Sequence, residues 1–285
     1  AYAKAVAGDP TSAAAYEGLG RALLGVPRVG NFGAPLAAGT ERADEAEAAL
    51  RAALALTPTD NDDLTAQLAF LDEARGDVAR WRKVVADELP AAAKAGGAEP
   101  TPPDAPPGWA PMFDGAPAVD VARTDDIMAL VAAGRPAVLP ELQRRAGFAP
   151  AEAWTAEALA GGALGGRVVK VSVSQSGRFD GPERGPLWGL GDDDEVLVRP
   201  PETHMRLADL LALLRAETRE AFYLEYNALH QYLGEGLRAM APAPADAAGL
   251  RPLVQNVWLG KGGTASPLHY DDYENLLAQV RGTKE

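Results

Sequence analysis

The sequence predicts an α+β protein, in which an N-terminal helical part precedes a part built on a β-sheet. Residues 1–90 place apolar side chains at helical spacing within alanine-rich segments, a pattern typical of amphipathic helices. After residue 118, short segments alternate apolar and polar residues between turn formers, as strands do. The proline-rich stretch 91–117 lies between them and excludes regular helix and central strand. We therefore expect a helical region over 1–90, a linker over 91–117 and a mixed domain over 118–285.

Two stretches of the helical part are alike. Ala5–Pro10 is similar to Ala53–Pro58, and helices are predicted around them at Ala43–Leu56 and over Leu64–Leu89, with a break at Gly76. This spacing resembles tetratricopeptide repeats, whose unit is about 34 residues, with an insertion at Val26–Thr40. The resemblance implies a concave surface that binds a partner peptide. The alternative is a helical hairpin bundle that only extends the fold.

The mixed domain contains clear strand and helix patterns. In the strand predicted at Val168–Ser174, the alternate residues Val169, Val171 and Val173 share one face. Residues 180–201 are predicted as loop, with an exposed acidic turn, and His204 is expected to cap a helix or to be solvated. The predicted strands are Val168–Ser174 and Ala221–Tyr226, and the predicted helices are Ile127–Ala133, after an N-cap signal at Thr124–Asp126, and Leu207–Arg219.

Composition excludes several kinds of protein. The formal net charge of −13 argues against nonspecific nucleic-acid binding, which needs clustered lysine and arginine, and against binding to an anionic membrane. The chain has no cysteine, so it forms no disulfide, thiolate metal site or cysteine nucleophile. No apolar run reaches the roughly 20 residues that span a bilayer. These features favour the cytoplasm or the nucleus.

The segment Asn256–Glu285 concentrates the residues that carry chemistry. His269 and Asp271 are two residues apart among strand formers, so an extended strand would point both to one face. A histidine and an aspartate supply two of the three ligands of a 2-His-1-carboxylate iron site. Taken alone, the pair is more often an ordinary hydrogen bond. Lys284 follows after a turn and is suited to pair with a second carboxylate.

A family resemblance covers this segment almost position for position. Ser266-Pro267-Leu268-His269-Tyr270-Asp271 is followed by Asn275-Leu276-Leu277-Ala278-Gln279-Val280-Arg281-Gly282-Thr283-Lys284. This order resembles the metal-binding segment of JmjC/cupin-like Fe(II)- and 2-oxoglutarate-dependent oxygenases, and most of all their protein-hydroxylase branch. The resemblance implies a double-stranded β-helix, or jelly roll, which is incomplete in this sequence.

The resemblance also implies roles for individual residues. His269 and Asp271 would hold Fe(II) together with a histidine on a later strand; the sequence has no histidine after His269, so it is expected to be a C-terminally truncated piece, inactive by itself. 2-Oxoglutarate and O₂ would complete the site. Lys284 would pair with the far carboxylate of 2-oxoglutarate, with help from Tyr223 and Ser266 (Tyr226 is the alternative to Tyr223), and Asn275 would lie beside the co-substrate.

The implied reaction is hydroxylation of a side chain in a protein or peptide substrate. Hydroxylation is favoured over demethylation because no zinc cluster or chromatin-reading segment accompanies the domain. Two other functions stay open. One is a non-catalytic scaffold that binds partners. The other is a cupin that uses another metal for isomerase or sugar chemistry, against which Lys284 and Ser266-Pro267 argue.

Overall fold

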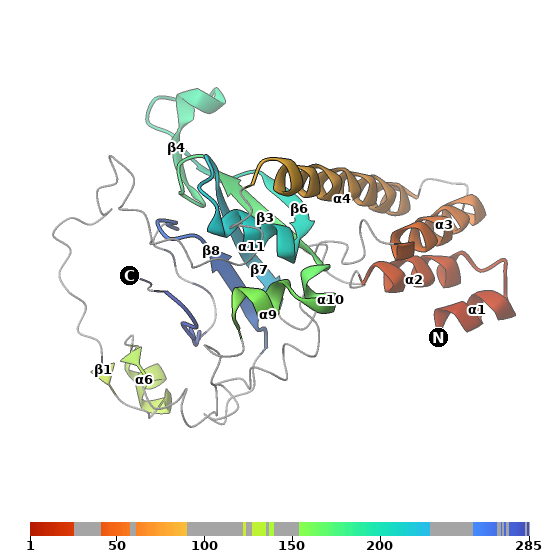
Figure 1. Ribbon diagram of the computed structural model, residues 1–285, viewed down its shortest axis with the longest axis horizontal. Coiled ribbons are helices and arrows are strands. Elements are labelled where there is room, and N and C mark those ends of the chain that lie inside the picture. Colours follow the sequence, from red (N-terminus) through yellow and green to blue (C-terminus); the bar gives the residue numbers. More distant parts are fainter. Residues whose placement is uncertain are drawn as a thin grey trace.

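The chain forms an α+β structure with N-terminal helices, as predicted; its larger sheet and its hairpin are antiparallel, and a short pair of strands is parallel (Figure 1). The predicted linker, the insertion at Val26–Thr40 and the N-cap at Thr124–Asp126 lie outside the described residues. The computed structural model describes residues 1–25, 41–57, 61–89, 122–123, 127–134, 137–139, 154–228, 253–266, 269, 271, 274–282 and 284.

The first helices of the described chain are α1 (Tyr2–Gly8), α2 (Ala13–Leu24) and α3 (Glu41–Leu56). Ser12 begins α2, where its hydroxyl accepts a hydrogen bond from the backbone N–H of Ala15 at 3.3 Å, which satisfies a donor that the helix leaves open. Helices α2 and α3 approach closely at Gly20, where a Cβ atom would lie 2.7 Å from Cγ of Leu50. The helix predicted at Ala43–Leu56 is confirmed and begins two residues earlier.

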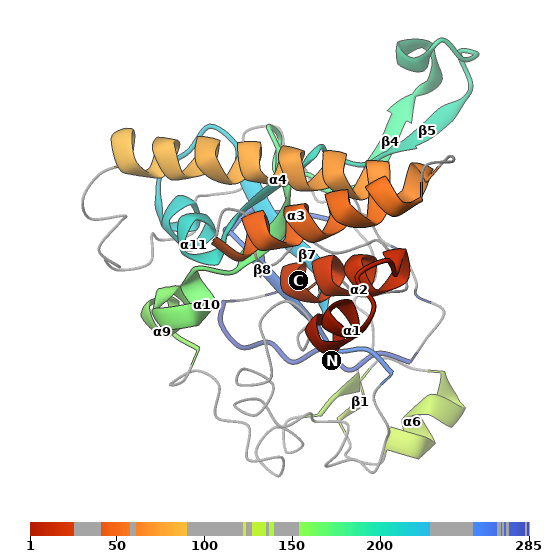
Figure 2. The ribbon, with the colours of Figure 1, turned by 90° about the vertical axis from the view of Figure 1, so that its right-hand side faces the viewer.

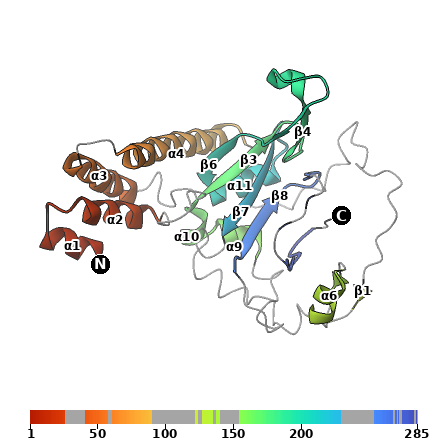
Figure 3. The ribbon, with the colours of Figure 1, turned by 180° about the vertical axis from the view of Figure 1, so that it is seen from behind.

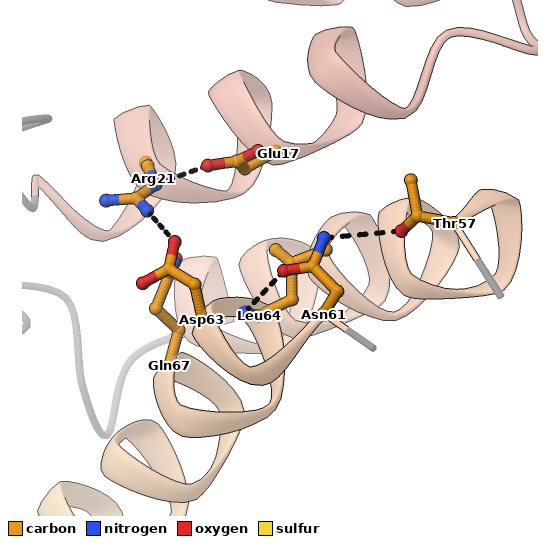
Figure 4. A network of polar contacts seen from close by, with 7 residues as sticks. All are labelled: Glu17, Arg21, Thr57, Asn61, Asp63, Leu64 and Gln67. Carbon is orange, nitrogen blue, oxygen red and sulfur yellow. Dashed lines mark hydrogen bonds and ion pairs between the residues drawn. The ribbon is translucent and has the colours of Figure 1, made fainter. Parts of the chain in front are cut away.

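A polar network joins α2 to α4 (Asp62–Asp87), as Figure 4 shows. The side chain of Arg21 is 11% exposed; its Nε lies 2.9 Å from Glu17 Oε1 and its Nη2 lies 2.7 Å from Asp63 Oδ2. Asn61 caps α4 by accepting from the N–H of Leu64 at 3.2 Å. The buried charge is thus paired with carboxylates of both helices, which fixes their relative position.

Helix α4 is continuous, so the predicted break at Gly76 is wrong. A glycine inside a helix costs about 1 kcal/mol relative to alanine. Burial of apolar side chains before and after Gly76 outweighs this cost, since each fully buried large side chain stabilises the fold by about 1.5–3 kcal/mol. The buried residues of α4 are Leu64, Leu68, Leu71, Ala74, Val78 and Trp81.

A four-stranded antiparallel sheet forms the centre of the second part, in the order β6-β3-β7-β8. The strands predicted at Val168–Ser174 and Ala221–Tyr226 are present, and β7 continues two residues beyond the predicted end. The bounds are β3 (Val168–Ser174), β6 (Glu202–Arg206), β7 (Ala221–Ala228) and β8 (Asn256–Gly260). Register places Ser172 opposite Tyr223, and Tyr223 opposite Gly260.

Helices cover one face of this sheet (Figures 1 and 3). They are α9 (Ala156–Ala160), α10 (Gly162–Gly165) and α11 (Leu207–Arg215), the last of which confirms the predicted amphipathic helix and ends earlier, while α4 contacts this side of the sheet at its β6 edge. Val169 and Val171 are fully buried on this face, and Val173 is partly buried, as their alternation predicted. One apolar cluster runs from Leu24 of α2 to Val257 of β8, so the N-terminal helices and the sheet share a core.

The region 180–201, predicted as loop, contains a hairpin that projects from the body (Figure 2). It consists of β4 (Gly181–Arg184), the 3-10 helix η1 (Gly185–Trp188) and β5 (Glu195–Val198). The acidic turn at Asp192–Glu195 is exposed, as predicted. The remaining described elements are β1 (Ala122–Arg123), β2 (Ala137–Val138) and the predicted helix α6 (Ile127–Ala133). None of the helices that the structure describes is long and apolar enough to cross a lipid bilayer.

Helix α4 protects the outer edge of the sheet. The carboxylate of Asp77 accepts the backbone N–H of His204 on β6 at 3.0 Å, which satisfies a donor that an edge strand would otherwise leave open to another strand. The expectation that His204 caps a helix or is solvated is wrong: the residue is 4% exposed, lies on β6, and contacts the ring of Phe70 at 5.0 Å. Local sequence gave no indication that α4 would pack there.

We expect the buried His204 to make the fold less stable in acid. Burial lowers the pKa of His204, with Asp77 opposing the effect, so the folded state binds the proton less readily than the unfolded state does. The contribution of neutral His204 to the free energy of unfolding is complete above the pKa of the unfolded state, about 6.5, and is lost as the pH falls below that value. Urea unfolding gives the free energy of unfolding at about pH 7.5 and about pH 5.5. The drop in this free energy between the two pH values should be smaller in His204→Gln than in the wild type. An equal difference in both proteins would contradict this role for His204.

Candidate functional site

The face of the sheet opposite the helices is polar. Ser172 of β3 lies opposite Tyr223 of β7, and the Ser172 hydroxyl donates to Glu225 Oε1 at 2.6 Å. Glu225, two residues after Tyr223, therefore shares its face. Burial raises the pKa of Glu225, and the hydrogen bond from Ser172 opposes that shift. The site candidate Tyr223 thus lies on a half-buried, polar surface rather than in the apolar core.

Two ion pairs border this surface. Lys170 Nζ lies 2.7 Å from Glu202 Oε1, and Arg199 Nε lies 3.4 Å from Asp180 Oδ1. Lys170 and Glu202 come from neighbouring strands, whereas Arg199 and Asp180 lie at the two ends of the projecting hairpin. The polar face therefore combines acids and bases.

A turn between β3 and β4 holds the chain just before the predicted metal segment. The N–H of Phe179 donates to the carbonyl of Ala265 at 2.8 Å, and the N–H of Ala265 donates to the carbonyl of Gly177 at 2.9 Å. Phe179 is fully buried, and its ring centre lies 5.1 Å from that of Tyr223. These contacts bring Ser266, which follows Ala265, to the part of the sheet that carries Tyr223.

The described residues after Ser266 are exposed at the positions predicted to bind ligands. His269, Asp271, Asn275 and Lys284 are each exposed and lie outside regular strands. The described residues show no strand around His269: His269 and Asp271 lie outside regular strands, and none of the described residues after Ser266 joins a ladder. A strand gains most of its stability from a paired neighbour, which local propensity alone does not supply.

Asp271 and Asn275 are brought together. Asn275 Nδ2 donates to Asp271 Oδ2 at 2.5 Å, as an outer partner orients a metal-binding carboxylate. His269 and Asp271 offer an imidazole nitrogen and a carboxylate oxygen, a donor chemistry that fits Fe(II). Among the residues that the structure describes, no group of three histidine, aspartate or glutamate side chains forms a metal site. The described chain thus supplies two donors of the predicted kind.

The end of the segment is anchored to the core. Val280 packs against the apolar cluster, and Gln279 Nε2 donates to the carbonyl of Arg281 at 2.6 Å. The pKa of Glu157 on α9 is lowered mainly by a hydrogen bond from the backbone, and the charge of Arg281 adds a small part of the shift. Lys284 follows three residues later and is exposed. The side chain of Tyr226, the alternative to Tyr223, lies outside the described residues.

Sequence reasoning missed two features around this site. One is Glu225, whose spacing from Tyr223 on a predicted strand could have placed it on the same face. The other is the turn at Gly177–Phe179, which pairs with residues distant in the chain. Two glycines with positive φ, Gly177 at 77° and Gly263 at 82°, mark the two turns, but only the fold shows that they meet.

If His269 and Asp271 bind a divalent metal, Asn275→Ala should weaken that binding by roughly 10- to 100-fold, the usual effect of removing an outer partner of a ligand. The reason is that Asp271 loses the donor that orients its carboxylate. Competition between the protein and a chromophoric chelator for Fe(II) measures the affinity without oxygen. Gln279→Ala is the matched control, since it removes an amide that bonds to a backbone carbonyl instead. Equal affinities for the two variants would contradict a role for Asn275.

A family profile described as "Cupin-like domain" matches residues 124–285, which is more than half of the chain and includes the sheet and every predicted ligand position. Neither the curated proteins nor the solved structures gave a match. The antiparallel sheet is consistent with such a domain. The chain therefore belongs to the family of proteins with a cupin-like domain.

Proposed function

We propose that this chain carries part of the site of an Fe(II)- and 2-oxoglutarate-dependent oxygenase that hydroxylates a side chain of a protein or peptide. Cupin-like domains include such enzymes, and the family match spans His269, Asp271 and Lys284. The observation that carries the proposal is the hydrogen bond from Asn275 to Asp271 at 2.5 Å. An amide that orients the carboxylate of a His-x-Asp pair is expected of a metal ligand.

In this proposal His269 and Asp271 hold the metal, with a third ligand outside the described residues. When bound, Fe(II) supplies the oxidising power, using O₂ and 2-oxoglutarate. The protein orients the donors and the co-substrate and excludes water. Asn275 engages Asp271 Oδ2, which would leave Oδ1 available to bind the metal.

Lys284 holds the co-substrate at its far end. Its ammonium pairs with the second carboxylate of 2-oxoglutarate, and the hydroxyls of Tyr223 and Ser266 donate to the same group. The contacts of Ala265 with Gly177 and Phe179 support this arrangement, because they place Ser266 beside the strand of Tyr223. Charge-assisted hydrogen bonds of this kind are stronger than neutral ones.

We further propose that the sheet is part of a jelly roll and that α1–α4 are hairpins of the tetratricopeptide type. The packing of α2 on α3 and the ion pair between Arg21 and Asp63 support a repeat-like stack. The helical region would then offer a surface for a partner peptide. We retain the boundaries 1–90, 91–117 and 118–285 as part of this proposal.

Turnover of 2-oxoglutarate in the full-length protein tests the function. The wild type should form succinate in the presence of Fe(II) and O₂, and Lys284→Ala should raise the KM for 2-oxoglutarate by about 10- to 100-fold, because losing a charge-assisted hydrogen bond costs roughly 1.5–3 kcal/mol. Lys83→Ala, which removes an exposed lysine on α4, should leave the KM unchanged. If the wild type forms no succinate, the proposed oxygenase function is overturned, and a non-catalytic scaffold that binds partners is favoured.

A further inference from the structure

The segment that precedes Ser266 pairs in parallel with the turn between β3 and β4. Arg178 pairs with Ala265, and Ala265 is bonded on both sides: its N–H donates to the carbonyl of Gly177 at 2.9 Å and its carbonyl accepts the N–H of Phe179 at 2.8 Å. Ala265 is thus held by two backbone hydrogen bonds to the turn between β3 and β4. This pairing joins residues that are far apart in the chain.

Glycine is needed where the two turns meet. Gly177 has φ of 77°, and a Cβ atom there would lie 3.1 Å from the carbonyl oxygen of Gly263, which itself has φ of 82°. A side chain at position 177 would therefore be strained by its backbone conformation and would push against the opposite turn. The close approach of the two backbones depends on the absence of this atom.

The same turn positions the ring of Tyr223. Phe179 is fully buried, and its ring contacts that of Tyr223 at 5.1 Å with the planes tilted by 50°. On β8, a Cβ atom at Gly260 would lie 2.9 Å from Cδ2 of Tyr223 and 3.2 Å from Oγ1 of Thr264. The ring of Tyr223 is therefore held between Phe179 and the backbone of the strand that leads to Ser266.

We infer that Gly177–Phe179 is a clamp that fixes the position of Tyr223 relative to Ser266, and through them the binding site for the far carboxylate of the co-substrate. The inference rests on the proposed function for its ligand, a dicarboxylic 2-oxo acid. Phe179 and Gly177 are positioning residues in this account, because they act through Tyr223 and Ala265. Opening the clamp should weaken 2-oxoglutarate binding without changing the metal ligands.

Two glycine substitutions separate the clamp from general backbone strain. Gly177→Ala introduces strain from positive φ and a contact with Gly263. Gly189→Ala is the control, because Gly189 has a nearly identical φ of 75° but open space where the Cβ atom would be. Both variants should lower the melting temperature. A second clamp variant, Phe179→Leu, keeps an apolar side chain but removes the ring contact with Tyr223.

Hydrogen exchange at the amide of Ala265 and steady-state kinetics give two independent readings in the full-length protein. Gly177→Ala should speed exchange at Ala265 by about tenfold and raise the KM for 2-oxoglutarate about fivefold or more, with kcat and Fe(II) affinity unchanged. Phe179→Leu should raise the KM in the same way, and Gly189→Ala should change neither reading.

The outcomes distinguish the clamp from the proposed enzyme. If the amide of Ala265 exchanges at the same rate in Gly177→Ala as in Gly189→Ala, the clamp is overturned. Faster exchange with an unchanged KM overturns its role in positioning the co-substrate. If the wild type forms no succinate, the proposed function fails, and exchange at Ala265 alone decides whether the turn holds the segment.

Discussion

Trp81→Ala should lower the free energy of unfolding by about 3–5 kcal/mol, the range for removing a large buried aromatic side chain. Trp81 is 9% exposed, contacts the ring of Phe222 at 5.2 Å in an edge-to-face arrangement, and donates from Nε1 to Thr203 Oγ1 at 2.8 Å. The variant loses these contacts together and leaves a cavity between α4 and the sheet. Chemical denaturation followed by circular dichroism measures the change.

Two further variants separate the contribution of the Trp81 hydrogen bond from that of its buried ring, and compare both with an exposed position of α4. Trp81→Phe keeps an aromatic ring but loses the hydrogen bond to Thr203, and should cost about 1–2 kcal/mol. Arg82→Ala, one residue further on the exposed side of α4, should change stability by less than about 0.5 kcal/mol. If Trp81→Ala were no more destabilising than Arg82→Ala, α4 would not be part of the core that it shares with the sheet.

His269→Ala should reduce the affinity of the full-length protein for Fe(II) by about 100-fold or more, beyond the 10- to 100-fold of an outer partner, because a direct ligand is lost. His269 is exposed and lies outside regular strands, so its removal should leave the melting temperature of the metal-free protein nearly unchanged. Chelator competition in the absence of oxygen measures the affinity, and thermal unfolding of the apoprotein measures the structural effect.

His204→Gln is the matched control for His269→Ala. His204 is a histidine of the same domain, but it lies on β6, is buried against α4, and has its Nδ1 3.5 Å from Asp77 Oδ2. We expect His204→Gln to alter stability and its pH dependence while leaving Fe(II) affinity unchanged. Similar losses of Fe(II) affinity in both variants would show that metal binding follows stability rather than the His269–Asp271 pair.

The sequence predicted those elements whose pattern is local. The alternation of valines in Val168–Ser174 gave β3, and the apolar stripe from Leu207 gave α11, because each pattern reports one buried face directly. Within the candidate site, the spacing of His269 and Asp271 and the residues that follow them carry the prediction of metal ligands. These inferences need only neighbours within a few positions.

The errors arose where a distant contact decides the structure. Trp81 donates to Thr203, 122 positions away, and such contacts keep α4 helical through Gly76 and bury His204. At the site, the segment around His269 has strand propensity, but no described residue of it pairs with a neighbouring strand. Periodicity describes which face of an element is apolar, whereas the partner of that face is set by the fold.

The most direct test of a metal site at His269 and Asp271 is an anaerobic titration of the full-length protein with Fe(II) and 2-oxoglutarate, followed by visible absorption. A bound 2-oxo acid that chelates Fe(II) gives a charge-transfer band. We predict this band in the wild type and its loss in His269→Ala, with His204→Gln retaining it. Absence of the band in the wild type, or its persistence in His269→Ala, would contradict the proposed iron site.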